Sequence, residues 1–226
     1  MSYLDHVLAH LRKDLRIEWR TKDSINGMLF FTLLVTVVFS LAFDPTAYPS
    51  IARQISGGLL WVGLLFAAMT ALNQSWAREL RNGSLEAQRL APSPASALFI
   101  GKALANFLFV TAVELILAPV FTLFYNLHPL GDAWMLAIIM PLGTWALVCN
   151  GTFFAALGLR ARNRELLLPL LLFPITMPCL LAAVQATTAV LTGDFPATLW
   201  LKVLIAYAII FTTVCVLTFD LILQAD

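Results

Sequence analysis

The sequence predicts an all-α integral membrane protein with six transmembrane helices and an amphipathic helix at its N-terminus. Two observations support this fold class. Hydrophobic residues make up 60% of the 226 residues and charged residues only 12%, whereas a soluble domain carries roughly 25% charged residues. The apolar residues also gather into runs that approach the ~20 residues a transmembrane helix needs. A chain this apolar cannot cover a surface that faces water, so we expect it to lie in a membrane.

The N-terminal segment, residues 1–25, predicts a helix that lies along the membrane surface. Leucines recur at helical spacing with basic residues between them: Leu4, Leu8, Leu11 and Leu15. This amphipathic pattern is typical of an interfacial helix, and Trp19 suits the headgroup level. The alternative is an ordinary helix that packs on a partner. We expect Asn26-Gly27 to break the helix before the first span.

Six apolar runs follow, and we expect each to cross the bilayer. They lie at about 28–43, 56–75, 97–125, 133–159, 166–190 and 199–223. The first is short, so we expect it to include part of residues 24–27. The fifth carries three prolines, which predict a bent or locally unwound helix. No room is left for a soluble domain, so residues 1–226 are interpreted as one transmembrane domain.

The distribution of Lys and Arg predicts the orientation. Twelve of the fourteen cations fall in the N-terminal segment, in residues 76–102 and in the turn 160–164, which an alternating six-span topology places on one side. Arg53 and Lys202, expected in loops, lie on the other side. The positive-inside rule makes the cation-rich side cytoplasmic, so both termini are expected there.

Residues 78–94, which we call the connector, join the second and third spans. They contain, in order, a helix break, a capping residue, an acidic first-turn residue and two prolines: Asn82-Gly83, Ser84, Glu86, Pro92 and Pro94. These features predict a short helix over residues 85–90. A plain linker is the alternative, but the turn 160–164 shows that a few residues suffice for that role. We therefore interpret the connector as a docking element for a cytoplasmic partner.

One carboxylate lies deep in an apolar run. Glu114 is near the middle of the third expected span, where a charge is costly and therefore a functional candidate by default. The alternatives are protonation or a structural hydrogen bond to a neighbouring helix. No Lys, Arg or His in the other spans is an obvious ion-pair partner for it.

Catalytic motifs are absent from the sequence. A Walker A loop requires G-x-x-x-x-G-K-[ST], but around Gly101-Lys102 the first Gly is replaced by Ser96 and the final Ser or Thr by Ala103. His6 and His10 share a helix face without a third ligand, so no metal site is assigned. We expect no enzyme activity of this chain itself, and the net charge of +1 gives no reason to expect nucleic acid as a partner.

The connector resembles that of the cytochrome c maturation protein B family, also called haem exporter protein B, whose members are membrane subunits of ABC-type complexes. The resemblance covers nearly the whole chain. Its most telling part is NGSLEAQRLAPSP at 82–94, in which Gly-Ser-Leu-Glu at 83–86 keeps the family pattern. Arg81 and Asn82 stand where the family has acidic residues. Exporters of the ABC-2 type share the general layout.

This resemblance implies an ABC-2-exporter-like fold in the bacterial inner membrane and a cytoplasmic ATPase whose groove receives the connector helix. The expected ATPase-coupling residues are Asn82, Gly83, Ser84, Leu85, Glu86 and Arg89. It also implies a haem-handling membrane protein and a small membrane subunit as partners, besides membrane lipid, and a homodimer is compatible with it. ATP hydrolysis would serve haem delivery or the release of a haem-loaded chaperone. The partners would bind ATP and haem, so no cofactor is assigned to this chain.

Two other functions stay open at this point. A generic ABC-2-type exporter permease for a lipid or a drug would need the same ATPase but would have no connection with haem. An ion-coupled secondary transporter would use Glu114 and would need no ATPase.

Overall fold

The computed structural model describes residues 2–81, 83, 93–158 and 164–224, with backbone only for 164–168 and 223–224. Every secondary-structure element assigned within these ranges is a helix. These elements are α1 (Tyr3–Thr21), α2 (Asp23–Phe43), α3 (Pro49–Arg81), α5 (Ala95–Tyr125), η1 (Ala133–Met135), α6 (Leu136–Leu157), α7 (Arg164–Thr192) and α8 (Thr198–Gln224). Six of these described helices are long and apolar enough to cross a membrane. The predicted all-α membrane class is therefore confirmed.

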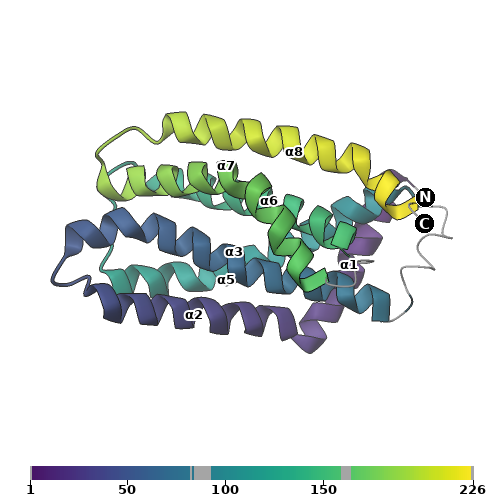
Figure 1. Ribbon diagram of the computed structural model, residues 1–226, viewed down its shortest axis with the longest axis horizontal. Helices are drawn as coiled ribbons and strands as arrows, with labels where there is room; N and C mark the ends of the chain where they lie inside the picture. Colours follow the sequence, from purple (N-terminus) through teal and green to yellow (C-terminus); the bar gives the residue numbers. More distant parts are fainter. Residues whose placement is uncertain (1, 82, 84–92, 159–163, 225–226) are drawn as a thin grey trace.

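The six long helices run side by side, and α1 lies across one end of them (Figure 1). Helices α2, α3 and α5 form one group and α6, α7 and α8 the other, joined by contacts of α3 with α7 and of α5 with α6. At the end crossed by α1, helix α3 ends, α5 begins and α8 ends (Figure 1). We call this end the base of the bundle.

Small residues allow the two groups to pack closely. Trp61 of α3 is fully buried, and its ring covers Gly143 of α6, where no Cβ atom would fit. Its indole N–H donates a hydrogen bond to the hydroxyl of Thr187 on α7 at 2.9 Å. Because lipid provides no hydrophobic driving force between helices, such close contacts and hydrogen bonds carry the association.

Three details of the expected helices are corrected. The break predicted at Asn26-Gly27 is wrong, because the Asn26 N–H donates to the Lys22 carbonyl at 2.9 Å and α2 runs on without interruption. The break lies instead at Lys22, whose φ of 56° is left-handed. Arg53 and Lys202 lie near the starts of α3 and α8 rather than in loops. Helix α7 continues through its three prolines without local unwinding, because each proline removes only one backbone donor, and the predicted bend stays a prediction.

Helix α1 presents two different faces. Val7, Asp14 and Glu18 are buried against the bundle. Leu4 and Trp19 remain 68% and 79% exposed on an adjacent face. The buried face shows that α1 packs on the protein itself, and the exposed apolar face fits contact with lipid at the headgroup level. The interfacial placement of α1 stays a prediction.

Helices α1 and α5 cross at Gly101 of α5. A Cβ atom on this glycine would lie 2.7 Å from the Cβ of His10 and 2.8 Å from the carbonyl oxygen of Val7, both on α1. Real Cβ contacts are not this short, and one of the two atoms belongs to the backbone. The crossing therefore requires glycine, and it sets how closely α1 approaches the start of α5.

We expect Gly101→Leu to displace α1 from the base and to lower stability by roughly 1–3 kcal/mol, the usual cost of overpacking. The measurement is trypsin cleavage in α1, at Arg12 and Arg16, together with thermal unfolding of the purified protein. Gly27→Leu is the matched control, because a Cβ at Gly27 of α2 meets no atom within 4 Å. Equal cleavage of the two variants would contradict the role of Gly101.

Candidate functional site

The connector leaves and re-enters the bundle at the base. Helix α3 continues to Arg81 and α5 begins at Ala95. Gly83 is exposed, has a left-handed φ of +63° and donates its N–H to the Leu80 carbonyl at 3.3 Å. Such a backbone favours glycine, which agrees with the predicted helix break. The other predicted coupling residues lie outside the described residues: Asn82, Ser84, Leu85, Glu86 and Arg89.

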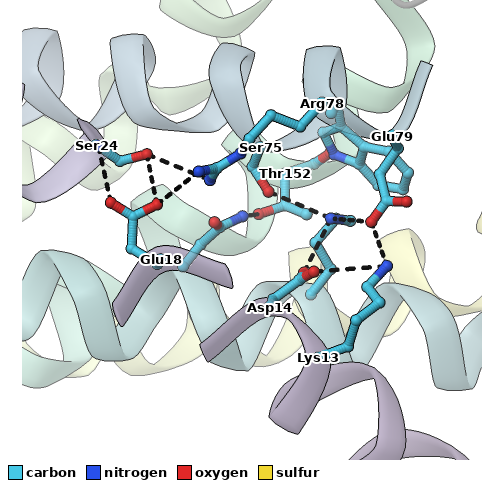
Figure 2. A network of polar contacts seen from close by, with 11 residues as sticks. Lys13, Asp14, Glu18, Ser24, Ser75, Arg78, Glu79 and Thr152 are labelled. Atoms are coloured by element: carbon cyan, nitrogen blue, oxygen red, sulfur yellow. Dashed lines mark hydrogen bonds and ion pairs between the residues drawn. The ribbon is translucent and has the colours of Figure 1, made fainter. Parts of the chain in front are cut away.

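Charged side chains from α1 and from the last turns of α3 meet in one network of polar contacts (Figure 2), which Lys102 of α5 joins. Among the described residues, the ion pairs here involve three cations and three anions, which we call the base network: Lys13, Arg78, Lys102, Asp14, Glu18 and Glu79. Lys13 pairs with Asp14 at 3.5 Å and also with Glu79. The charges balance within the network, as charges removed from water require.

Lys102 lies at the centre of the base network and is only 1% exposed. Its Nζ lies 2.9 Å from Asp14 Oδ2 and 3.1 Å from Glu79 Oε1, and it donates to the Ser75 hydroxyl at 3.3 Å. The ammonium group also lies 4.9 Å from the centre of the Trp76 ring, within the range of a cation–π contact. One cation from α5 therefore binds carboxylates from α1 and α3 together.

Glu18 forms the second part of the base network and explains the turn at Lys22. Its carboxylate accepts hydrogen bonds from the backbone N–H groups of Ser24 and Ile25 at 2.8 and 3.1 Å, and thus caps the N-terminus of α2. Arg78 of α3 donates to the same carboxylate at 2.8 Å. Burial by itself raises the pKa of Glu18, but the hydrogen bonds from Arg78, Ile25 and Ser24 outweigh it and hold that pKa below its ordinary value.

Helix α6 is tied to the same region by uncharged groups. The indole N–H of Trp76 donates to the carbonyl oxygen of Thr152 at 2.9 Å, and the side-chain amide of Asn106 donates to the Thr152 hydroxyl at 3.1 Å. The last turns of α3 and the first turns of α5 are thus fastened to α1, α2 and α6. Among the described residues, no group of His, Cys, Asp or Glu is arranged to hold a metal ion. The base network and these hydrogen bonds therefore hold α1, α2, α3, α5 and α6 together at the base.

Sequence reasoning did not find the base network. It counted Lys102 among the cytoplasmic cations, whereas the structure buries this side chain, and it did not single out Asp14 or Glu18. A signal was present: Val7, Asp14 and Glu18 follow one another at helical spacing, so two carboxylates share a face with an apolar residue. Carboxylates on such a face indicate buried cations on the helix opposite.

Glu114 lies apart from the base network. It is 12 residues beyond Lys102 on α5, or roughly 18 Å along the helix axis. The hydroxyl of Thr144 on α6 donates to its two carboxyl oxygens, at 3.0 and 2.9 Å. The hydrogen bond to a neighbouring helix, one of the predicted alternatives, is thus observed. A functional role for Glu114 stays a prediction.

Comparison with known proteins identifies similar sequences over most of the chain. The family model described as "CcmB protein" matches residues 5–223. "Heme exporter protein B" of Rhodobacter capsulatus is 36% identical over 175 residues, which are 76% of this chain and 78% of the relative. The protein of the same name from Paracoccus denitrificans is 34% identical over 191 residues, 84% and 86% of the two chains. That from Pseudomonas aeruginosa is 31% identical over 205 residues, 89% and 90% of the two chains.

We expect Lys102→Met to lower the free energy of unfolding by roughly 3–5 kcal/mol, because it leaves buried carboxylates without their main partner. Adding Asp14→Asn should recover part of this loss, so that the double variant costs less than the sum of the single ones by roughly 0.5–3 kcal/mol. The measurement is denaturant unfolding in detergent followed by tryptophan fluorescence. Arg20→Met, which removes an exposed cation of α1, should have little effect. Additive effects of the two substitutions would argue against the ion pair.

Acid should weaken the contact between Glu18 and Arg78. Because folding lowers the pKa of Glu18 from its ordinary value of 4.5, its contribution is complete above that value and is lost as the pH falls through the lower pKa of the folded protein. Thermal unfolding of the wild type and of Glu18→Gln should therefore differ most near neutral pH and converge below pH 4.5. Asp194→Asn, at an exposed carboxylate, is the control. A difference that stays constant with pH would contradict the assignment.

Proposed function

The chain belongs to the CcmB protein family, and from this premise we propose that it is the membrane subunit of an ABC-type complex that serves cytochrome c maturation. The proposal is supported by six helices long enough to cross a membrane and by relatives that carry the name heme exporter protein B. In this proposal a separate ATPase subunit binds ATP. This chain converts the movement of that subunit into a movement of the bundle.

The observation that carries the proposal is the ion pair between Glu79, in the part of the connector that continues α3, and Lys102 of α5, which is 3.1 Å long. A force applied to the connector therefore acts on α3 and α5 together. Asp14 binds the same Lys102, so α1 moves with them. Coupling additionally requires that the ATPase contact the connector differently in its two nucleotide states.

We place the base on the cytoplasmic side of the bacterial inner membrane, with both chain termini on that side. The positive-inside rule supports this orientation, since twelve of the fourteen cations lie in segments assigned to that side. The connector would then face the cytoplasm, where a soluble ATPase can reach it.

The remaining partners in the proposal are a haem-handling membrane protein and a small membrane subunit. The name of the relatives, heme exporter protein B, supports haem as the group whose handling is driven by ATP hydrolysis. We propose that ATP hydrolysis drives haem delivery or the release of a haem-loaded chaperone, with haem bound by the partner proteins and no cofactor held by this chain.

Gly83→Pro should separate ATP hydrolysis from cytochrome c assembly, because proline cannot adopt the φ of +63° found at Gly83. Glu86→Arg should act similarly by reversing a charge in the connector. We expect both variants to insert into the membrane and to retain ATPase activity in the purified complex, with c-type cytochromes, measured by haem staining of cells, reduced at least tenfold. Gly27→Ala, at an open position on α2, is the matched control.

Normal cytochrome c levels with both connector variants would argue against a coupling role. Purification of the tagged wild-type chain in gentle detergent tests the rest of the proposal. An ATPase recovered together with a haem-handling membrane protein is the expected result. Recovery of an ATPase without that protein would favour a generic exporter, and recovery of no ATPase would overturn the docking role of the connector.

A further inference from the structure

Glu114 is an ionisable group in the middle of α5 that the proposed coupling mechanism does not use. It is 6% exposed, and its carboxyl group is hydrogen-bonded to Thr144 of α6. Among the described residues, the ion pairs all lie at the base, and none includes Glu114. A carboxylate at this depth without a cation is costly, so its charge must be compensated in another way.

Glu114 lines a small cavity between α2, α3 and α5. The cavity has a volume of about 20 Å³, which is enough for one water molecule. Thr32 and Thr36 of α2 contribute hydroxyl groups to its wall. The rest of the wall is mainly hydrocarbon, from Val35, Leu59, Leu60, Leu64, Leu117 and Phe121. Thus Glu114 and the two threonines supply the polar side chains of this cavity.

The two threonine hydroxyls act as hydrogen-bond acceptors toward the cavity. Thr32 donates its own hydroxyl proton to the Met28 carbonyl, and Thr36 donates to the Thr32 carbonyl, both at 2.7 Å. Their oxygen atoms therefore keep only lone pairs for other partners. A carboxylate also has only lone pairs to offer. A cavity with acceptors alone requires an occupant that donates hydrogen bonds.

We propose that Glu114 is a proton-binding site in the membrane, at which the carboxylic acid keeps its proton and donates a hydrogen bond to one water molecule, which in turn donates hydrogen bonds to the hydroxyl oxygens of α2. The described residues that line the cavity with Glu114 or donate a hydrogen bond to it are threonines, one glycine and apolar residues, none of them titratable. A proton is therefore the charge available to neutralise it. A metal cation fits less well, because it needs a fuller shell of oxygen ligands than this largely hydrocarbon wall provides.

This inference does not depend on the proposed coupling function. The cavity lies between α2 on one side and α3 and α5 on the other, so a motion that separates these helices would admit water. The acid proton would then pass to that water, and the carboxylate would remain, solvated. Glu114 therefore holds its proton while α2, α3 and α5 are packed together as in this structure.

The first test is labelling with dicyclohexylcarbodiimide, a hydrophobic reagent that adds to protonated carboxylic acids and leaves an N-acylurea. Peptide mass spectrometry of the purified wild-type complex at neutral pH should find the adduct on Glu114, with labelling that declines as the pH rises. Glu114→Gln should lose the adduct completely. Asp220→Asn, which changes an exposed carboxylate of α8, should leave the labelling of Glu114 unchanged. Protection by sodium chloride, but not by choline chloride, would show a cation site and overturn the proposal.

The second test does not require the reagent to reach the cavity. Because the folded protein holds a proton that the unfolded chain releases, the stability of the wild type should fall from neutral to alkaline pH relative to Glu114→Gln. Glutamine is neutral and of similar shape, so the variant is expected to fold. Thermal unfolding of both proteins across this pH range measures the difference. A difference that does not change with pH would overturn the proposal, whatever the labelling shows.

Discussion

The ion pairs of Lys102 determine how the base of this bundle is built. An ammonium group that is almost completely buried must have anionic partners, and these come from α1 and α3. Asp14 and Glu79 therefore bring together a helix lying across the bundle and a helix running along it. Gly101, next to Lys102, allows α1 to approach closely enough for this contact. Lys102 and Gly101 together set how closely α1 approaches the start of α5.

The need of buried polar groups for partners also explains the turn between α1 and α2. The first N–H groups of a helix have no partner within it, and at the start of α2 the carboxylate of Glu18 accepts two of them. Arg78 balances the charge of that carboxylate. Polar groups at the base thus replace the contacts that water would otherwise provide. The apolar remainder of α3 packs against α7. In the middle of the bundle, the polar surroundings of Glu114 among the described residues are the hydroxyl of Thr144 and a small cavity with two threonines.

Much of the fold was predictable because membrane spans depend on local composition. The apolar runs identify the spanning helices, and five of the six described spanning helices end within two residues of the predicted span. Helix α3 runs six residues further, to Arg81, just before the break predicted at Asn82-Gly83. The break predicted at Asn26-Gly27 does not occur, because a helix tolerates both residues when another group, here Glu18, caps its start. The site was less predictable. Its carboxylates lie on α1, far in sequence from Lys102, so no local pattern pairs them.

Taken by itself, the sequence determined that the chain enters the membrane, where its six spans lie and where a glycine breaks the helix after Arg81. Hydrophobicity and backbone preference act within a few residues, so these features need no knowledge of distant contacts. Only the tertiary structure decided that Lys102 is buried rather than exposed and which carboxylates bind it. Ion pairs between residues 88 positions apart, such as Asp14 and Lys102, exist only after the helices have packed.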